Sequence, residues 1–280
     1  MENKGYVQVG IGTVAKDKPE DTVWIDVYLV EVMPVADGDV NAKQKINVTN
    51  EDSSKSNVTK NVSKSMTIRA KWLPLHNSNR ASAPDVVSGE RVQIWQDSGN
   101  SDIYYWTSMA LSQRKKEKVI FTFSNKHEVR TNEASPALGE DLYYLQVDTR
   151  NQMIHLHTAD NEGEKSKYDF IINTKEGIVT FEDVQGNFFK LESVDGILTA
   201  HINNDVIISH DRDMKITTGK SHTESIGSFR KTDIKENCDT TIGGDMTKKV
   251  SGNITQQAGS TATYKSGGVT IIKGSLVQIN

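Results

Sequence analysis

Residues 218–280 repeat with a period of eight when they are written as TGKSHTES (218–225), IGSFRKTD (226–233), IKENCDTT (234–241), IGGDMTKK (242–249), VSGNITQQ (250–257), AGSTATYK (258–265), SGGVTIIK (266–273) and GSLVQIN (274–280). The second position of these octads is most often glycine. The first position is apolar in five consecutive octads, at Ile226, Ile234, Ile242, Val250 and Ala258. A fixed internal period indicates an array whose units bury their apolar faces only by stacking.

An octad is too short to enclose a core within one chain. Its first and fifth positions have the same parity, so on an extended strand they point to the same face. Each octad offers only one or two such apolar residues, whereas three chains wound together would supply three octads per turn. The sequence therefore predicts an intertwined homotrimeric, triple-stranded β-helix, or prism, with the first-position residues on the threefold axis. As a monomer it would stay unfolded, because ordering the backbone costs about 1–2 kcal/mol per residue. The alternative is a disordered tail rich in Gly, Thr and Lys.

Composition places the rest of the chain among β proteins that do not bind nucleic acid. Only 35% of the 280 residues are hydrophobic, and turn-forming and β-branched residues are common. The formal net charge is −4, and a trimer would carry three times that charge, which argues against a nucleic-acid partner. The single cysteine, Cys238, excludes an intrachain disulfide framework. The first residues contain no apolar leader and no run of eighteen apolar residues occurs, so we expect synthesis in the cytoplasm without a membrane span.

The first part of the chain alternates apolar and polar residues in short runs, which is typical of strands. A handful of strands with one long polar loop fit a small Greek-key barrel of the OB type, so the fold class is all-β. The segment KVIFTFSNK (118–126) either adds a sixth strand or leads out of the barrel. The barrel strands are expected at GYVQVGIGTV (5–14), TVWIDVYLVEVMPV (22–35), SMTIRAKWLPL (65–75), GERVQIWQD (89–97) and DIYYWTSMAL (102–111).

These patterns divide the chain into four parts. We expect a barrel domain at 1–125 with a long polar surface loop at about 36–65, followed by a linker at 126–141. Residues 142–217 carry short strands about ten residues apart and form the wider, upper part of the same trimer. The last two of these predicted strands are DVIISHD (205–211) and MKITT (214–218). The octad β-helix occupies 218–280.

His155 and His157 are the only candidate metal ligands with a useful spacing. They lie in QMIHLHT (152–158), where a strand would place both imidazoles on one face. In a threefold assembly, six such nitrogens could converge on a transition metal on the axis. The alternative is a pair of polar strand residues that are solvated or hydrogen-bonded. The sequence has no G-x-S-x-G, no P-loop and no Cys-His constellation, so we expect no enzymatic activity and no other cofactor.

Two regions of the chain resemble one known family. The run 67–109, with IRAKWLPLHNSNRASAPDVVSGERVQIW (68–95) and DIYYWTSM (102–109), resembles the N-terminal barrel of the central spike proteins in the baseplates of contractile-tailed phages. The octads resemble the β-helix of the same spikes and of the VgrG proteins of type VI secretion. The resemblance implies a homotrimer in the virion that plugs the tail tube and punctures the host outer membrane when the sheath contracts. It also implies a baseplate hub protein that holds the N-terminal barrel.

This chain departs from the family in two places. Some members carry a lysozyme domain between barrel and helix, but only about residues 125–142 separate the two regions here, so no lytic activity is implied. Members without a separate tip protein carry a His-x-His iron site near the C-terminal tip. His155 and His157 lie about 125 residues before the C-terminus, so the resemblance does not assign them that role.

The C-terminal end is apolar and has no charged cap. An open β-prism end exposes strand edges and apolar side chains, which proteins normally cover. We therefore expect a separate tip protein, similar to the conical PAAR-repeat proteins, to dock on Ser275, Leu276, Val277, Gln278, Ile279 and Asn280. Two other functions stay open: a VgrG-like secretion spike, which usually has longer hub domains before its barrel, and a trimeric receptor-binding or polysaccharide-active tail protein, which would need a larger binding or catalytic domain.

Overall fold

The structure is a computed structural model that describes residues 5–29, 45–51, 57–63, 67–75, 79–98, 100–109, 116–124, 142–160 and 163–279. Within these ranges every regular element is a β-strand, which confirms the all-β class. The chain divides into two compact units, Met1–Ser209 and His210–Asn280. None of the described residues form a helix that is long and apolar enough to cross a membrane.

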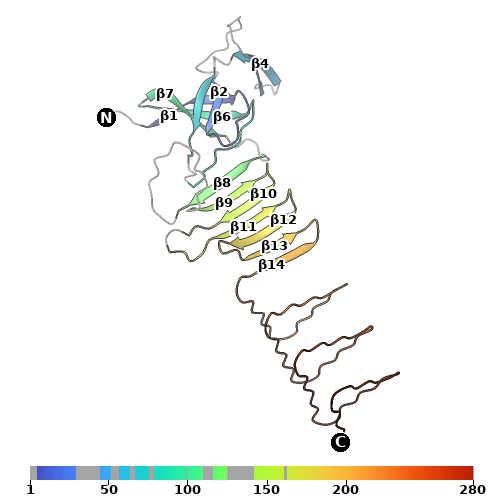
Figure 1. Cartoon of the computed structure of the whole chain (residues 1–280). Helices are drawn as coiled ribbons and strands as arrows, with labels where there is room; N and C mark the ends of the chain where they lie inside the picture. The colour runs from blue at the N-terminus through green and yellow to red at the C-terminus, as the bar shows by residue number, and fades with distance from the viewer. Residues whose placement is uncertain are drawn as a thin grey trace. The chain divides into compact units, whose positions relative to one another are not determined.

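The predicted barrel is present as a closed ring of strands in the order β1-β2-β5-β7-β6, with β6 returning to pair with β1 (Figure 1). The β5–β7 pair is parallel, and the other pairs of the ring are antiparallel. The alternating runs in the sequence form these strands, because each places one side chain in two inside the ring. The bounds are β1 (Tyr6–Val14), β2 (Trp24–Leu29), β5 (Ile68–Trp72), β6 (Arg91–Asp97) and β7 (Asn100–Ser108).

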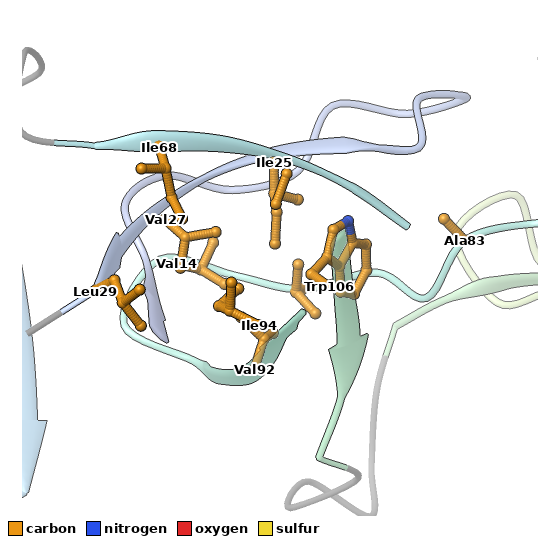
Figure 2. Close-up of a cluster of buried hydrophobic side chains, with 11 residues drawn as sticks. Val14, Ile25, Val27, Leu29, Ile68, Ala83, Val92, Ile94 and Trp106 are labelled. Atoms are coloured by element: carbon orange, nitrogen blue, oxygen red, sulfur yellow. The ribbon is translucent and has the colours of Figure 1, made fainter. Parts of the chain in front are cut away.

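The barrel encloses a single apolar core, in which the labelled side chains point toward one another (Figure 2). Trp106 is fully buried, and its indole Nε1 donates a hydrogen bond to the backbone oxygen of Val23 at 3.0 Å. Gly12 lies where β1 passes closest to this core. A Cβ at Gly12 would lie 2.3 Å from Cγ1 of Val27 and 3.0 Å from Cγ1 of Ile94. The core residues are Val14, Ile25, Val27, Leu29, Ile68, Ala70, Ala83, Val86, Val92, Ile94 and Trp106.

The polar segment 36–65, predicted to be a surface loop, contains a hairpin. β3 (Lys45–Glu51) and β4 (Asn57–Ser63) pair antiparallel as a separate two-stranded sheet. The signal for these strands was the alternation of Val, Ile and Thr with polar residues in KINVTNE and NVTKNVS. The prediction of a loop gave more weight to the polar composition of the segment than to this alternation. The remainder of the segment and the predicted linker 126–141 lie outside the described residues.

The second sheet is an antiparallel meander in sequence order, from β8 to β14 (Figure 1). The sequence allows the segment 118–126 either to add a sixth barrel strand or to lead out of the barrel. Its residues Lys118–Phe123 form β8, which pairs with β9 rather than with a barrel strand. Gly177 and Gly196 lie in tight turns between strands of this sheet. Both have positive φ, a backbone conformation that favours glycine. The bounds are β8 (Lys118–Phe123), β9 (Tyr143–Asp148), β10 (Met153–His157), β11 (Tyr168–Asn173), β12 (Ile178–Asp183), β13 (Phe188–Glu192) and β14 (Ile197–His201).

A buried charge cluster joins the barrel to this sheet. Asp85 accepts from Lys18 Nζ at 3.1 Å and from Arg150 Nη2 at 2.9 Å, which ties the β1–β2 loop to the β9–β10 turn. The ammonium of Lys18 also donates to the backbone oxygens of Pro19 and Thr22, so it has three acceptors for its three N–H groups. A buried charge with all its hydrogen bonds made is tolerated, whereas an unpaired one is not.

The second unit has a regular period but no strands of its own. The chain bends once every eight residues, from 203–204 to 267–268, and no described residue of 204–279 is in a strand. The strands predicted at 205–211 and 214–218 are therefore not formed in the single chain, and these residues belong to the octad period instead. These early octads are hard to recognise in the sequence, because their bends begin with Asn203 and Asp211 rather than with glycine.

A side chain at position 12 should destabilise the barrel by overpacking its core. We expect Gly12→Val to lower the free energy of unfolding by about 1–3 kcal/mol. Gly5→Val is the matched control, because no atom lies within 4 Å of a Cβ built there. Urea unfolding followed by tryptophan fluorescence measures this directly, since all four tryptophans (Trp24, Trp72, Trp95 and Trp106) lie in barrel strands. Equal stability of the two variants would show that Gly12 is not tightly packed.

Candidate functional site

One face of the β8–β14 sheet is entirely apolar along two rows that cross all the strands. Because side chains alternate between faces, the residues that oppose one another in register share a face. The first row is Phe121, Leu145, Leu156, Phe170, Phe181, Phe189 and Ala200. The second row is Val119, Val147, Ile154, Ile172, Val179, Leu191 and Leu198. We call these two rows the apolar sheet face.

The apolar sheet face stays accessible to solvent in the single chain. Phe181 is 44% exposed, Phe189 is 51% exposed and Leu198 is 71% exposed. Beside the first row, the ring of Tyr168 stacks on the ring of Phe181, which belongs to that row, with the centroids 5.8 Å apart. Monomeric soluble proteins rarely leave a contiguous apolar surface of this extent uncovered, and such a surface marks an interaction site.

The opposite face of the same strands holds the two predicted histidines. His155 and His157 alternate with Ile154 and Leu156 along β10, so both imidazoles point away from the apolar sheet face. On β11, Asp169 lies directly opposite His157. His155 Nε2 and His157 Nδ1 both lie 2.6 Å from the same carboxylate oxygen, Oδ1 of Asp169. The structure therefore brings the predicted pair together and adds a carboxylate to it.

Tyr144 of β9 holds the two imidazole rings in place. Its ring stacks on His157, with the centroids 4.6 Å apart and the planes 16° apart, and meets His155 edge-on. The Tyr144 hydroxyl lies 3.2 Å from Nδ1 of His155. Partial burial acts to raise the pKa of the Asp169 carboxyl, but the hydrogen bonds and charges of His157 and His155 outweigh it and lower that pKa.

His157 is only 6% exposed, and its Nε2 is buried without a hydrogen-bond partner among the described residues. An unsatisfied buried polar atom costs about 1–3 kcal/mol and is uncommon in folded proteins. Sequence reasoning found the histidines from their spacing, but it missed Asp169 and Tyr144. The β10–β11 connection is long, so the sequence does not show which residue of β11 lies opposite His157.

The first-position residues of the octads are less solvent-exposed than most apolar residues of the second unit. Ile226, Ile234, Ile242 and Val250 are 44–49% exposed, whereas Phe229 is 77% exposed. Ala258 is exposed in the single chain. No backbone–backbone hydrogen bond forms within the described residues 210–279, so this unit's backbone groups need partners from elsewhere.

The predicted docking residues at the C-terminus are exposed from Ser275 to Ile279, and Asn280 lies outside the described residues. Leu276 and Ile279 are among the most exposed apolar side chains of the chain. Their role in binding a tip protein stays a prediction.

No model of a known protein family matches the chain, and no curated protein matches it. The likeness to baseplate spikes is thus a resemblance of the run 67–109 and of the octads alone.

Asp148 closes the turn between the strands that carry Tyr144 and the histidines. Its Oδ1 accepts hydrogen bonds from the backbone N–H groups of Arg150 and Asn151, both at 3.0 Å, and its Oδ2 accepts one from Asn151 Nδ2 at 2.9 Å. Burial acts to raise the pKa of Asp148, but the hydrogen bonds from Asn151 and Arg150, with the charge of Lys118, lower it overall. A lowered pKa means that the folded state favours the ionised carboxylate.

The stability that Asp148 contributes should therefore be present at neutral pH and lost in acid. We expect Asp148→Asn to lower the free energy of unfolding by about 1–2 kcal/mol at pH 7, because the hydrogen bonds then lose their charged acceptor. The difference from the parent protein should shrink as the pH falls below the carboxyl's ordinary pKa of about 4. Asp195→Asn, at an exposed loop position, is the control. A pH-independent difference measured by chemical denaturation would contradict this assignment.

Proposed function

We propose that three copies of this chain form the central spike of a contractile-tail baseplate. The spike plugs the tail tube in the virion and punctures the host outer membrane when the sheath contracts, and it has no lysozyme activity. The observation that carries this proposal is that the sheet and the octads both present apolar residues that one chain cannot bury.

The apolar sheet face favours a second and third copy of this chain as its cover. It continues without a polar residue from β8 to β14, so its partner must be apolar over the same length. Three such faces turned toward one axis would cover each other. Burying one Phe or Leu side chain fully contributes about 1.5–3 kcal/mol, so two rows supply a large driving force for assembly.

The octads favour three chains for a related reason. Their first-position residues recur once for every bend of a chain that forms no backbone hydrogen bonds of its own within the described residues 210–279. In an intertwined β-helix, each backbone group would pair with a neighbouring chain, and the first-position residues would fill the axis. A prism hydrogen-bonded in this way resists bending, which is the property needed to transmit force from the contracting sheath to the membrane.

The barrel supports the hub-binding end of the proposal. Its closed ring has a strand order that departs from the sequence order, as in a Greek-key barrel, which is consistent with the OB type of spike barrels. In the proposed assembly the three barrels sit in the baseplate hub protein. The exposed apolar residues among Ser275 to Ile279 would be covered by a PAAR-like tip protein.

The trimer is tested by light scattering together with an unboiled SDS gel. We expect a mass three times the chain's 31.1 kDa and a band that resists SDS. Ile242→Asp should abolish this species, because it would bury three unpaired charges around the axis. Thr247→Asp, at the sixth position of the same octad, which is polar in six consecutive octads, should leave the trimer intact. A monomeric parent protein would refute the spike, and an SDS-resistant Ile242→Asp trimer would refute the axial register.

The sheet offers an independent test on two neighbouring residues. Phe181→Glu places a charge on the apolar sheet face and should weaken trimer association at least tenfold, measured by sedimentation as a function of concentration. Thr180→Glu is the matched control, because Thr180 lies on the other face of β12, where it is in register with Lys190. Equal association of the two variants would show that the apolar sheet face is not the subunit interface.

A further inference from the structure

We propose that His155, His157 and Asp169 together bind one divalent transition-metal ion per chain. The ion would lie between β10 and β11, held by the two imidazoles and the carboxylate. The described residues of these strands contribute no other carboxylate, imidazole or thiol to this cluster.

The ligand atoms already converge to nearly the spacing that such an ion requires. One ligand atom from each of the three side chains lies within 4.8 Å of the other two. In a tetrahedral site with metal–ligand bonds of about 2.0–2.1 Å, neighbouring ligand atoms are about 3.3 Å apart. The two imidazole nitrogens are now 2.6 Å from Asp169 Oδ1, so each contact needs to open by less than about 1 Å.

The chemistry of the three ligand atoms decides which ion the cluster suits. Both imidazoles direct a nitrogen at the same carboxylate oxygen, so two nitrogens and one oxygen face a common point. Two nitrogen ligands and one oxygen ligand suit zinc, iron, nickel or copper, whereas calcium and magnesium prefer oxygen ligands alone.

Tyr144 supports the site by orienting both rings. Its hydroxyl can either donate to or accept from Nδ1 of His155, so it serves that ring whether Nε2 carries a proton or binds the ion. Its ring, stacked on His157, restricts the rotation of that imidazole. Rings held in this way lose less entropy when the ion binds.

The alternation along β10 determines where the ions would lie in the assembly. Leu156 belongs to the apolar sheet face, so His155 and His157 point away from it. If that face turns toward the threefold axis, as in the proposed trimer, the ions lie away from the axis. The assembly would then hold three separate ions, each linking two strands of one chain, rather than one ion shared by six histidines. Only the number of ions per assembly and their position away from the axis rest on the proposed function; one ion per chain does not.

The site is tested by titrating the full-length protein, stripped with EDTA, with zinc chloride in a calorimeter. We expect one Zn²⁺ per chain, with at least tenfold weaker binding in His155→Gln and in Asp169→Asn. His201→Gln is the matched control. His201 of β14 lies in the same row across the sheet as His157 and Asp169, but it hydrogen-bonds to Asn203 rather than to this cluster. Zinc binding that is unchanged in His155→Gln and Asp169→Asn, or that is lost in His201→Gln, would overturn the assignment.

Hydrogen exchange of the unmutated protein gives a second readout that does not depend on the folding of variants. Zn²⁺ should slow amide exchange at least threefold in peptides that cover 153–157 and 168–173, and leave the octads unchanged. No slowing in these strands would overturn the site. A light-scattering mass measured on the same sample separates the two proposals. A monomer that binds Zn²⁺ would refute the trimer and keep the metal site, and a trimer that binds none would do the reverse.

Discussion

The structure depends most on the alternation of side chains across the β8–β14 sheet. It places two apolar rows on one face and a row with Tyr144, His157 and Asp169 on the other. The apolar rows need a cover, since their exposure to water opposes folding of the single chain. The octads need partners for their apolar side chains and also for their backbone groups, because they form no backbone–backbone hydrogen bonds of their own. Assembly with further copies, as proposed, would satisfy both needs by one mechanism.

The charge cluster around Asp85 shows a different use of burial. Lys18 and Arg150 come from the barrel and from the sheet, and each pairs with one oxygen of the Asp85 carboxylate. Replacing a buried ion pair with apolar residues often costs nothing in stability, so such a pair is weak evidence for stabilisation. Its directional hydrogen bonds do hold the β1–β2 loop at one place on the β9–β10 turn. The sheet and the barrel are thereby joined within the first unit.

The histidine cluster follows from the alternation that creates the apolar sheet face. A strand with an apolar residue at every second position has its other positions available for polar groups, and β10 fills two of them with imidazoles. The β10–β11 register then selects the residue opposite His157, and that residue is Asp169. A metal site and a subunit interface can therefore share one strand without competing for the same side chains.

The sequence by itself determined the all-β class, the barrel strands and the eight-residue period, because these patterns lie in neighbouring residues. Alternation and turn residues are local, so Trp24, Trp72, Trp95 and Trp106 were placed in strands correctly. Only the tertiary structure decided the partners of β8, the hairpin inside the polar segment, and the early octads at Asn203 and Asp211. It alone placed Asp169 and Tyr144 beside the histidines. Strand pairing depends on hydrogen bonds between residues far apart in the chain, and their register follows from the packing of whole sheets rather than from local sequence.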